Sequence, residues 1–185
     1  MSLQKTKGPS WNDVKAKLAA FDHAGLVGLL QALYAASKDN QALLQARLGL
    51  GEDTLKPYKA AIDRWLWPDR SLNQAPSAAK AKKVLADYRN AAGQPEELTE
   101  LMVFYCERAA GFAEESGLDE ESYYDALART FEQAVRTAVA LPPGRRADLL
   151  ARLDLVRRRS HDFGYGVGAD MDDCFIEHGF DIPAE

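Results

Sequence analysis

The feature that most constrains this fold is an apolar residue recurring every three or four positions through the second half of the chain. The clearest run starts at Pro95, a second starts near Asp119, and a third covers about 145–159. This spacing lines one face of an α-helix. In the first run the apolar positions are Leu98, Leu101, Met102, Tyr105, Ala109 and Phe112. No stretch shows the period-two alternation typical of a strand, so the sequence predicts an all-α protein with no sheet.

Capping residues mark where several helices begin. Ser10 with Asp13 forms a capping pair, and Asp22, Thr54 and Asp170 each precede or begin another helical run. The connections between the longer runs are only a few residues long, which is typical of antiparallel neighbours. We therefore expect an irregular stack or bundle of about seven to eight antiparallel helices, arranged as helical hairpins.

The domain organisation follows from length and composition. With 185 residues, of which 46% are hydrophobic, the chain is long enough for one compact domain. We expect that helical domain to span 10–180, and the proline-bounded connector at 68–76 is where it would subdivide. Residues 1–9 are expected to be disordered or tag-derived.

Cysteine content and hydropathy predict a cytoplasmic protein. Cys106 and Cys174 are too few for a disulfide framework and suit a reducing compartment. No apolar run has the length of a membrane span, and the N-terminus lacks the apolar core of a signal peptide. We expect no membrane association.

The net charge of −5 conceals two halves of opposite sign. Residues 1–95 hold 14 Lys and Arg against 8 Asp and Glu, whereas residues 96–185 hold 9 against 20. The basic half includes a short helix with Lys80, Lys82, Lys83 and Arg89, which raises the question of nucleic acid. Because the sequence pI is about 5.3, nucleic acid is an unlikely partner, and solvated helix faces explain the charge more simply.

The segment "RRRSHDFGYGVGADMDDC", residues 157–174, is the most unusual part of the sequence. Arginine side chains and glycine backbone N–H groups at a helix start can bind an anion. The candidate anion-binding residues are Arg157, Arg158, Gly164, Gly166 and Gly168. The alternative is a tight interhelical turn in which the glycines supply unusual backbone angles.

The same segment also raises a metal hypothesis. Asp170, Cys174 and His178 recur every four residues and would share one helical face, with His161 arriving from the loop. Carboxylate, thiolate and imidazole ligands suit zinc. The alternative assigns Asp170 to the helix N-cap and Cys174 to the core, and no other cofactor is predicted.

No catalytic motif accompanies these residues. His23, His161 and His178 stand in no recognised nucleophile or metalloprotease pattern, and Cys106 lies in the most apolar helix. We therefore expect a non-enzymatic protein that binds a protein partner or forms a homo-oligomer. Tyr58, Trp65 and Trp67 are the candidate interface residues, because aromatic side chains dominate contact hot spots. One alternative is an anion-binding, metal-binding or enzymatic protein that uses the segment Arg157–His178. The other is a nucleic-acid-binding protein that uses the basic N-terminal half.

The order of segments resembles a bacterial all-helical family known as domain of unknown function 6155. The resemblance covers about residues 50–180. It runs from "LKPYKAAIDRWLWP" through "SYYDALARTFEQAV" to the terminal turn Asp162, Phe163, Gly164, Tyr165 and Gly166. It implies a helical fold, and it implies no reaction and no functional residues.

Overall fold

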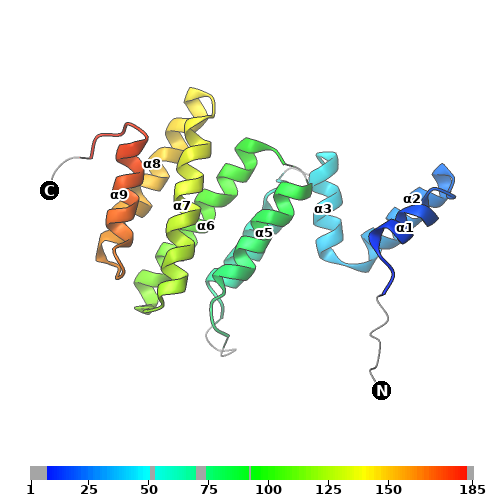
Figure 1. Cartoon of the computed structure of the whole chain (residues 1–185), viewed down its shortest axis with the longest axis horizontal. Helices are drawn as coiled ribbons and strands as arrows, with labels where there is room; N and C mark the ends of the chain where they lie inside the picture. The colour runs from blue at the N-terminus through cyan, green and yellow to red at the C-terminus, as the bar shows by residue number, and fades with distance from the viewer. Residues whose placement is uncertain (1–7, 51–52, 70–73, 92, 183–185) are drawn as a thin grey trace, which may run out of the picture. The chain divides into compact units, whose positions relative to one another are not determined.

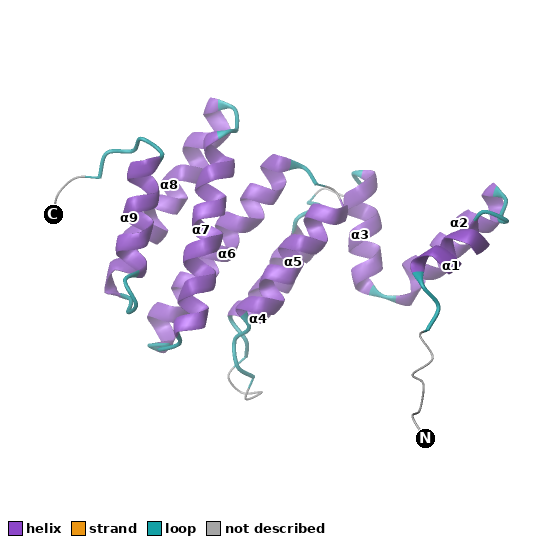
Figure 2. Ribbon diagram, in the orientation of Figure 1, coloured by secondary structure: helices purple, strands orange, loops and turns teal. Residues whose placement is uncertain are grey.

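A computed structural model describes residues 8–50, 53–69, 74–91 and 93–182 of the chain. These residues form nine α-helices and one 3-10 turn, with no strand among them, as Figures 1 and 2 show. The helices are α1 (Trp11–Leu18), α2 (His23–Ala36), α3 (Lys38–Leu48), α4 (Lys56–Leu66), α5 (Ala78–Ala91), α6 (Pro95–Ser116), α7 (Glu121–Val139), α8 (Pro143–Arg159) and α9 (Val167–Glu177). The all-α prediction is confirmed.

Contacts divide the chain into two compact units, Met1–Leu44 and Gln45–Glu185. The division falls within α3, whereas the sequence placed a subdivision at 68–76. The single domain at 10–180 stays a prediction. The expectation for residues 1–9 falls mostly outside the described residues, which begin at Gly8.

The second unit is a two-layered stack of helices. Helices α4, α6 and α8 pack side by side in one layer, and α5, α7 and α9 pack side by side in the other. Each helix also packs against its sequence neighbour across the layers, which gives the stepped arrangement in Figure 1. Short connections and apolar faces produce this packing, because each helix must cover the apolar face of its neighbours.

Helix α6 lies at the centre of this unit and has the widest buried face. It packs against α4, α5, α7 and α8. Leu101, Tyr105 and Cys106 on this helix are completely buried, as is Phe131 on α7. Burial raises the pKa of the Cys106 thiol far above its usual range, so this cysteine is an inert packing residue.

The first residues of the helices show which of the predicted capping residues are correct. The side chain of Ser10 accepts a hydrogen bond from the Asp13 backbone, and Asp22 caps α2 through Gly25 N at 2.7 Å, so both predicted caps are confirmed. The prediction for Thr54 is wrong. Asp53 Oδ1 accepts from the first N–H groups of this turn, at Leu55 and Lys56, while the Thr54 hydroxyl donates to Glu97.

Unlike the second unit, the first unit contains no buried core among its described residues. None of residues 8–36 is buried. Helices α1 and α2 pack against each other only sparsely. These two helices therefore satisfy their backbone hydrogen bonds but leave their large apolar side chains partly exposed.

Candidate functional site

The segment 157–178 forms the end of α8, a short turn at Ser160–Asp162, and α9. Arg157 is buried and forms ion pairs with Asp154 at 2.9 Å and with Asp172 on α9. Arg158 pairs with Asp154 at 2.8 Å. Both predicted anion-binding arginines are therefore paired with carboxylates of the same chain, and Arg157 ties α8 to α9.

Two of the three predicted glycines have a structural reason to be glycine. Gly166 has φ 74° and precedes the first residue of α9. A Cβ atom at Gly168 would lie 2.8 Å from His161 Cα, so the close approach of α9 to the turn requires a glycine there. Gly164 has open space around it. These observations favour the turn over the anion site.

The predicted metal ligands take separate roles. Helix α9 starts at Val167, so Asp170 lies in its first turn rather than at the N-cap, and that interpretation of Asp170 is wrong. His178 Nδ1 lies 2.8 Å from the carbonyl oxygen of Cys174, and His161 Nε2 lies 3.2 Å from Asp172. Burial raises the pKa of Cys174 to about 11, which opposes the thiolate that zinc requires. No three potential ligands converge among the described residues, so the zinc hypothesis gains no support.

The candidate interface aromatics lie in three different environments. Tyr58 is buried against Tyr88, with the ring centroids 5.1 Å apart. Trp65 is half-buried beneath Lys80, whose Nζ lies 4.2 Å from the ring centroid. That lysine belongs to the basic helix considered for nucleic acid. Trp67 borders a cavity.

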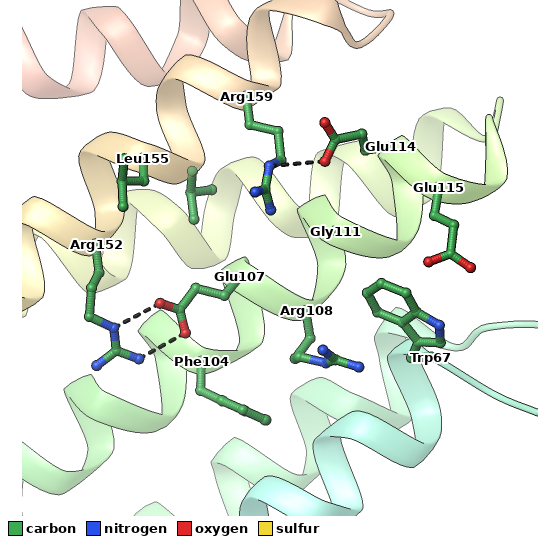
Figure 3. A pocket seen from close by; sticks show the side chains of 11 residues that line it. Trp67, Phe104, Glu107, Arg108, Gly111, Glu114, Glu115, Arg152, Leu155 and Arg159 are labelled. Atoms are coloured by element: carbon green, nitrogen blue, oxygen red, sulfur yellow. Dashed lines mark hydrogen bonds and ion pairs between the residues drawn. The ribbon is translucent and has the colours of Figure 1, made fainter.

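That cavity is an open groove of about 670 Å³ in the second unit, which we call the arginine groove. Residues at helical spacing on α6 and α8 form its two sides, and Trp67 at the end of α4 closes one end, as Figure 3 shows. From α6 come Phe104, Glu107, Arg108, Gly111, Glu114 and Glu115. From α8 come Arg152, Leu155, Val156 and Arg159. Its volume lies within the usual range for small-molecule sites.

A network of charged groups supports one end of the arginine groove. Arg152 donates to both carboxylate oxygens of Glu107 at 2.7 and 2.8 Å and to Glu100 at 2.7 Å. Glu100 is buried and also accepts from Lys59 and Arg145. Although burial alone would raise the pKa of Glu100, the hydrogen bonds from Arg152 and Lys59 outweigh it and lower the pKa. This network joins α4, α6 and α8.

The other end of the groove holds two arginines with less complete pairing. Arg108 stacks over Trp67 at 4.2 Å, and its Nε lies 2.5 Å from Asp63. Arg159 pairs with Glu114 at 3.0 Å, drawn dashed in Figure 3. Gly111 lies between Trp67 and Arg159, because a Cβ atom there would be 2.9 Å from the Trp67 ring and 3.8 Å from Arg159 Nη1.

Sequence reasoning missed the arginine groove apart from Trp67. Its charged residues come from α6 and α8, which are separated along the chain by the whole of α7. The available signal was a pair of arginines two helical turns apart on α8, at Arg152 and Arg159, opposite a row of charged residues on α6. Pairing those rows required knowledge of which helices are neighbours.

A second candidate surface is the apolar face of α2, which we define by Leu26, Val27, Leu29, Leu30, Leu33 and Tyr34. These six side chains are 37–49% exposed. From Ala24 to Ala36 the helix has no charged residue. Nearby, Trp11, Val14 and Phe21 are also exposed. None of the described helices is both long and apolar enough to span a bilayer.

Comparison with known proteins adds no family. No family model, no curated protein and no solved structure matches this chain. The resemblance to domain of unknown function 6155 therefore stays a prediction, and the function must be argued from the surfaces described above.

Proposed function

We propose that this protein is a non-enzymatic self-associating module in which the apolar face of α2 packs against the same face of a second copy. The single observation that carries the proposal is the exposure of all six large apolar side chains of an uncharged helix. A helix that is apolar over most of its surface is normally buried. Contiguous exposed apolar patches in proteins mark sites of association.

The absence of charge on α2 favours a second copy over a different partner. In a two-fold symmetric interface the same surface meets itself, so a charge near the symmetry axis would face its own copy, and a charge elsewhere would need an opposite charge on the same surface. From Ala24 to Ala36 this helix carries no Asp, Glu, Lys or Arg, and self-pairing therefore meets no repulsion. It also offers no charge pattern by which a different partner would be selected.

The magnitudes are consistent with reversible association. Covering a half-exposed apolar side chain gains ~1 kcal/mol, so two copies burying the six side chains of α2 with Trp11, Val14 and Phe21 would gain on the order of 18 kcal/mol. Bringing two chains together costs about 4–15 kcal/mol. A mid-range cost leaves about 8 kcal/mol, which corresponds to a dissociation constant of about 1 µM.

Replacing Leu30 by Glu tests this proposal. Leu30 lies in the middle of the apolar face, and two-fold pairing would bring two such carboxylates together in an apolar interface. We expect Leu30→Glu to raise the dimer dissociation constant by at least about 100-fold, because juxtaposed like charges cost several kcal/mol. Sedimentation velocity measures the change.

Ala35→Glu is the matched control, because it adds the same charge at an exposed position of α2 about 140° around the helix from Leu30. We expect it to leave the dissociation constant within about threefold. Circular dichroism checks that both variants keep the helical content of the unsubstituted chain. Equal association by all three proteins would contradict the proposal. Binding of a monomeric chain to lipid vesicles or to a different protein would assign the same face to another partner.

A further inference from the structure

The arginine groove contains two guanidinium groups whose donors are not used up by the protein. Arg108 and Arg159 each approach a carboxylate through Nε, at Asp63 and Glu114 respectively. Their Nη atoms make no hydrogen bond to any part of the chain that the structure describes. A guanidinium has five N–H donors in a fixed fork, so both residues retain donors that can reach an anion.

Arg108 and Asp63 form an ion pair whose geometry does not meet that of a hydrogen bond. Its Nε and Asp63 Oδ1 are buried and lie 2.5 Å apart, yet neither atom completes a hydrogen bond within the described residues. Arg152 is different, because Glu107 and Glu100 occupy its Nε and both of its Nη atoms. The two ends of the groove therefore have separate roles: Arg152 holds the helices together, and Arg108 and Arg159 face the open space beside Gly111.

The ion pair between Arg159 and Glu114 is the one that a ligand would replace. Both side chains are largely solvent-accessible, at 44% and 58%. Pairs of this kind contribute little stability, so an incoming carboxylate that makes two parallel hydrogen bonds can displace the glutamate. In the free protein Glu114 occupies the position of the ligand's charged group.

The acidic residues of the arginine groove disfavour a doubly charged anion more than a singly charged one. Three arginines and three glutamates line it, with Asp63 beside Arg108. Glu115 makes no ion pair with any described residue. A doubly charged phosphate would therefore be repelled more strongly than a monocarboxylate.

An apolar surface lies beside these arginines. Trp67, Phe104 and Val156 line the groove, and Leu155 on its side is 66% exposed. Gly111 keeps a side chain out of the space between Trp67 and Arg159. The groove can therefore cover an apolar group while its charged end meets the arginines.

We propose that the arginine groove binds a small monocarboxylate with an apolar body, whose carboxylate replaces Glu114 on Arg159 and accepts from Arg108. The body lies against Trp67, Phe104 and Leu155. All residues of this site belong to the second unit, whereas α2 belongs to the first.

Calorimetric titration with 4-phenylbutyrate tests the site on the full chain. Butyrate lacks the apolar body, 4-phenylbutan-1-ol lacks the charge, and phenyl phosphate carries the larger charge. We expect 4-phenylbutyrate to bind at least about tenfold more tightly than each of the three. Equal binding of the alcohol would overturn the role of the arginines, and tighter binding of phenyl phosphate would overturn the monocarboxylate.

Two substitutions with opposite expected effects on the affinity for 4-phenylbutyrate test the roles of Glu114 and Arg159. Glu114→Gln removes the internal competitor and should tighten binding of 4-phenylbutyrate by about threefold to tenfold. Arg159→Gln should weaken it by at least about tenfold, while Arg158→Gln, which alters a neighbouring arginine outside the groove, should leave it unchanged. Misfolding cannot tighten binding, so tighter binding by Glu114→Gln would not be an effect of a damaged fold. An unchanged affinity in this variant would overturn the proposal whatever the other variants show.

Discussion

At the scale of single residues, backbone conformation explains the most unusual segment of the sequence. Tyr165 and Gly166 follow each other in the left-handed region, with φ values of 62° and 74°. The hydroxyl of Tyr165 donates to Asp119 at 2.7 Å, which anchors this turn to the start of α7. Gly166, one of the three glycines considered for anion binding, therefore allows a sharp entry into α9.

Substitution of Gly166 tests this explanation. Open space surrounds Gly166, so a new side chain there meets no atom within 4 Å and only the backbone angle resists it. We expect Gly166→Val to lower the free energy of unfolding by about 1–3 kcal/mol. Gly164→Val is the control, because Gly164 also has open space but no left-handed φ, and it should cost less than about 1 kcal/mol. Urea denaturation measures both, and equal losses would contradict the explanation.

At the scale of helices, the buried carboxylate of Glu100 holds one layer of the stack together. It accepts hydrogen bonds from Lys59 on α4 and from Arg145 and Arg152 on α8. A buried carboxylate with several cationic partners is much more costly to remove than a surface ion pair.

Replacing Glu100 by Gln leaves those cations without their shared anion. We expect the free energy of unfolding to fall by about 2 kcal/mol, below the 3–5 kcal/mol of a fully buried pair, because Arg152 and Lys59 keep solvent contact. Glu96→Gln is the control, since Glu96 is 53% exposed and forms an ion pair with Arg145. That control should change stability by less than about 0.5 kcal/mol.

The difference in stability between the unsubstituted protein and Glu100→Gln should depend on pH. The pKa of Glu100 is lower in the folded protein than its ordinary value of 4.5, so its stabilisation is present above that pH. As the pH falls through the lowered pKa, the carboxylate is protonated and the stabilisation is lost. The difference in unfolding free energy between the unsubstituted protein and Glu100→Gln should therefore shrink below about pH 4.5. A difference that stays constant down to pH 3 would contradict this assignment.

A structural feature could be predicted from the sequence when the residues that cause it lie close together in the chain. The caps at Ser10 and Asp22 were predictable because they depend on residues three positions apart. Asp170 was misplaced because a left-handed glycine starts α9 earlier than a side-chain cap would. The arginine groove was not predictable, since Trp67, Arg108 and Arg159 meet only after three helices have packed.

At the scale of the whole molecule, the two units contrast in how they use apolar residues. The second unit buries most of its large apolar side chains between two layers of helices, with Leu101, Leu127, Leu149 and Leu153 completely covered. In the first unit, the leucines of α2 remain at least 37% exposed. This contrast is the basis for proposing that α2 completes its packing with a second copy.

The most direct test is sedimentation equilibrium of the intact, unsubstituted chain over a range of about 0.1–100 µM, which brackets the expected dissociation constant. We predict that the mass rises from one chain of 20.4 kDa to two. The midpoint should hardly change with added salt, because the apolar face of α2 has no charged residue. The mass of a single chain at every concentration would contradict self-association through α2.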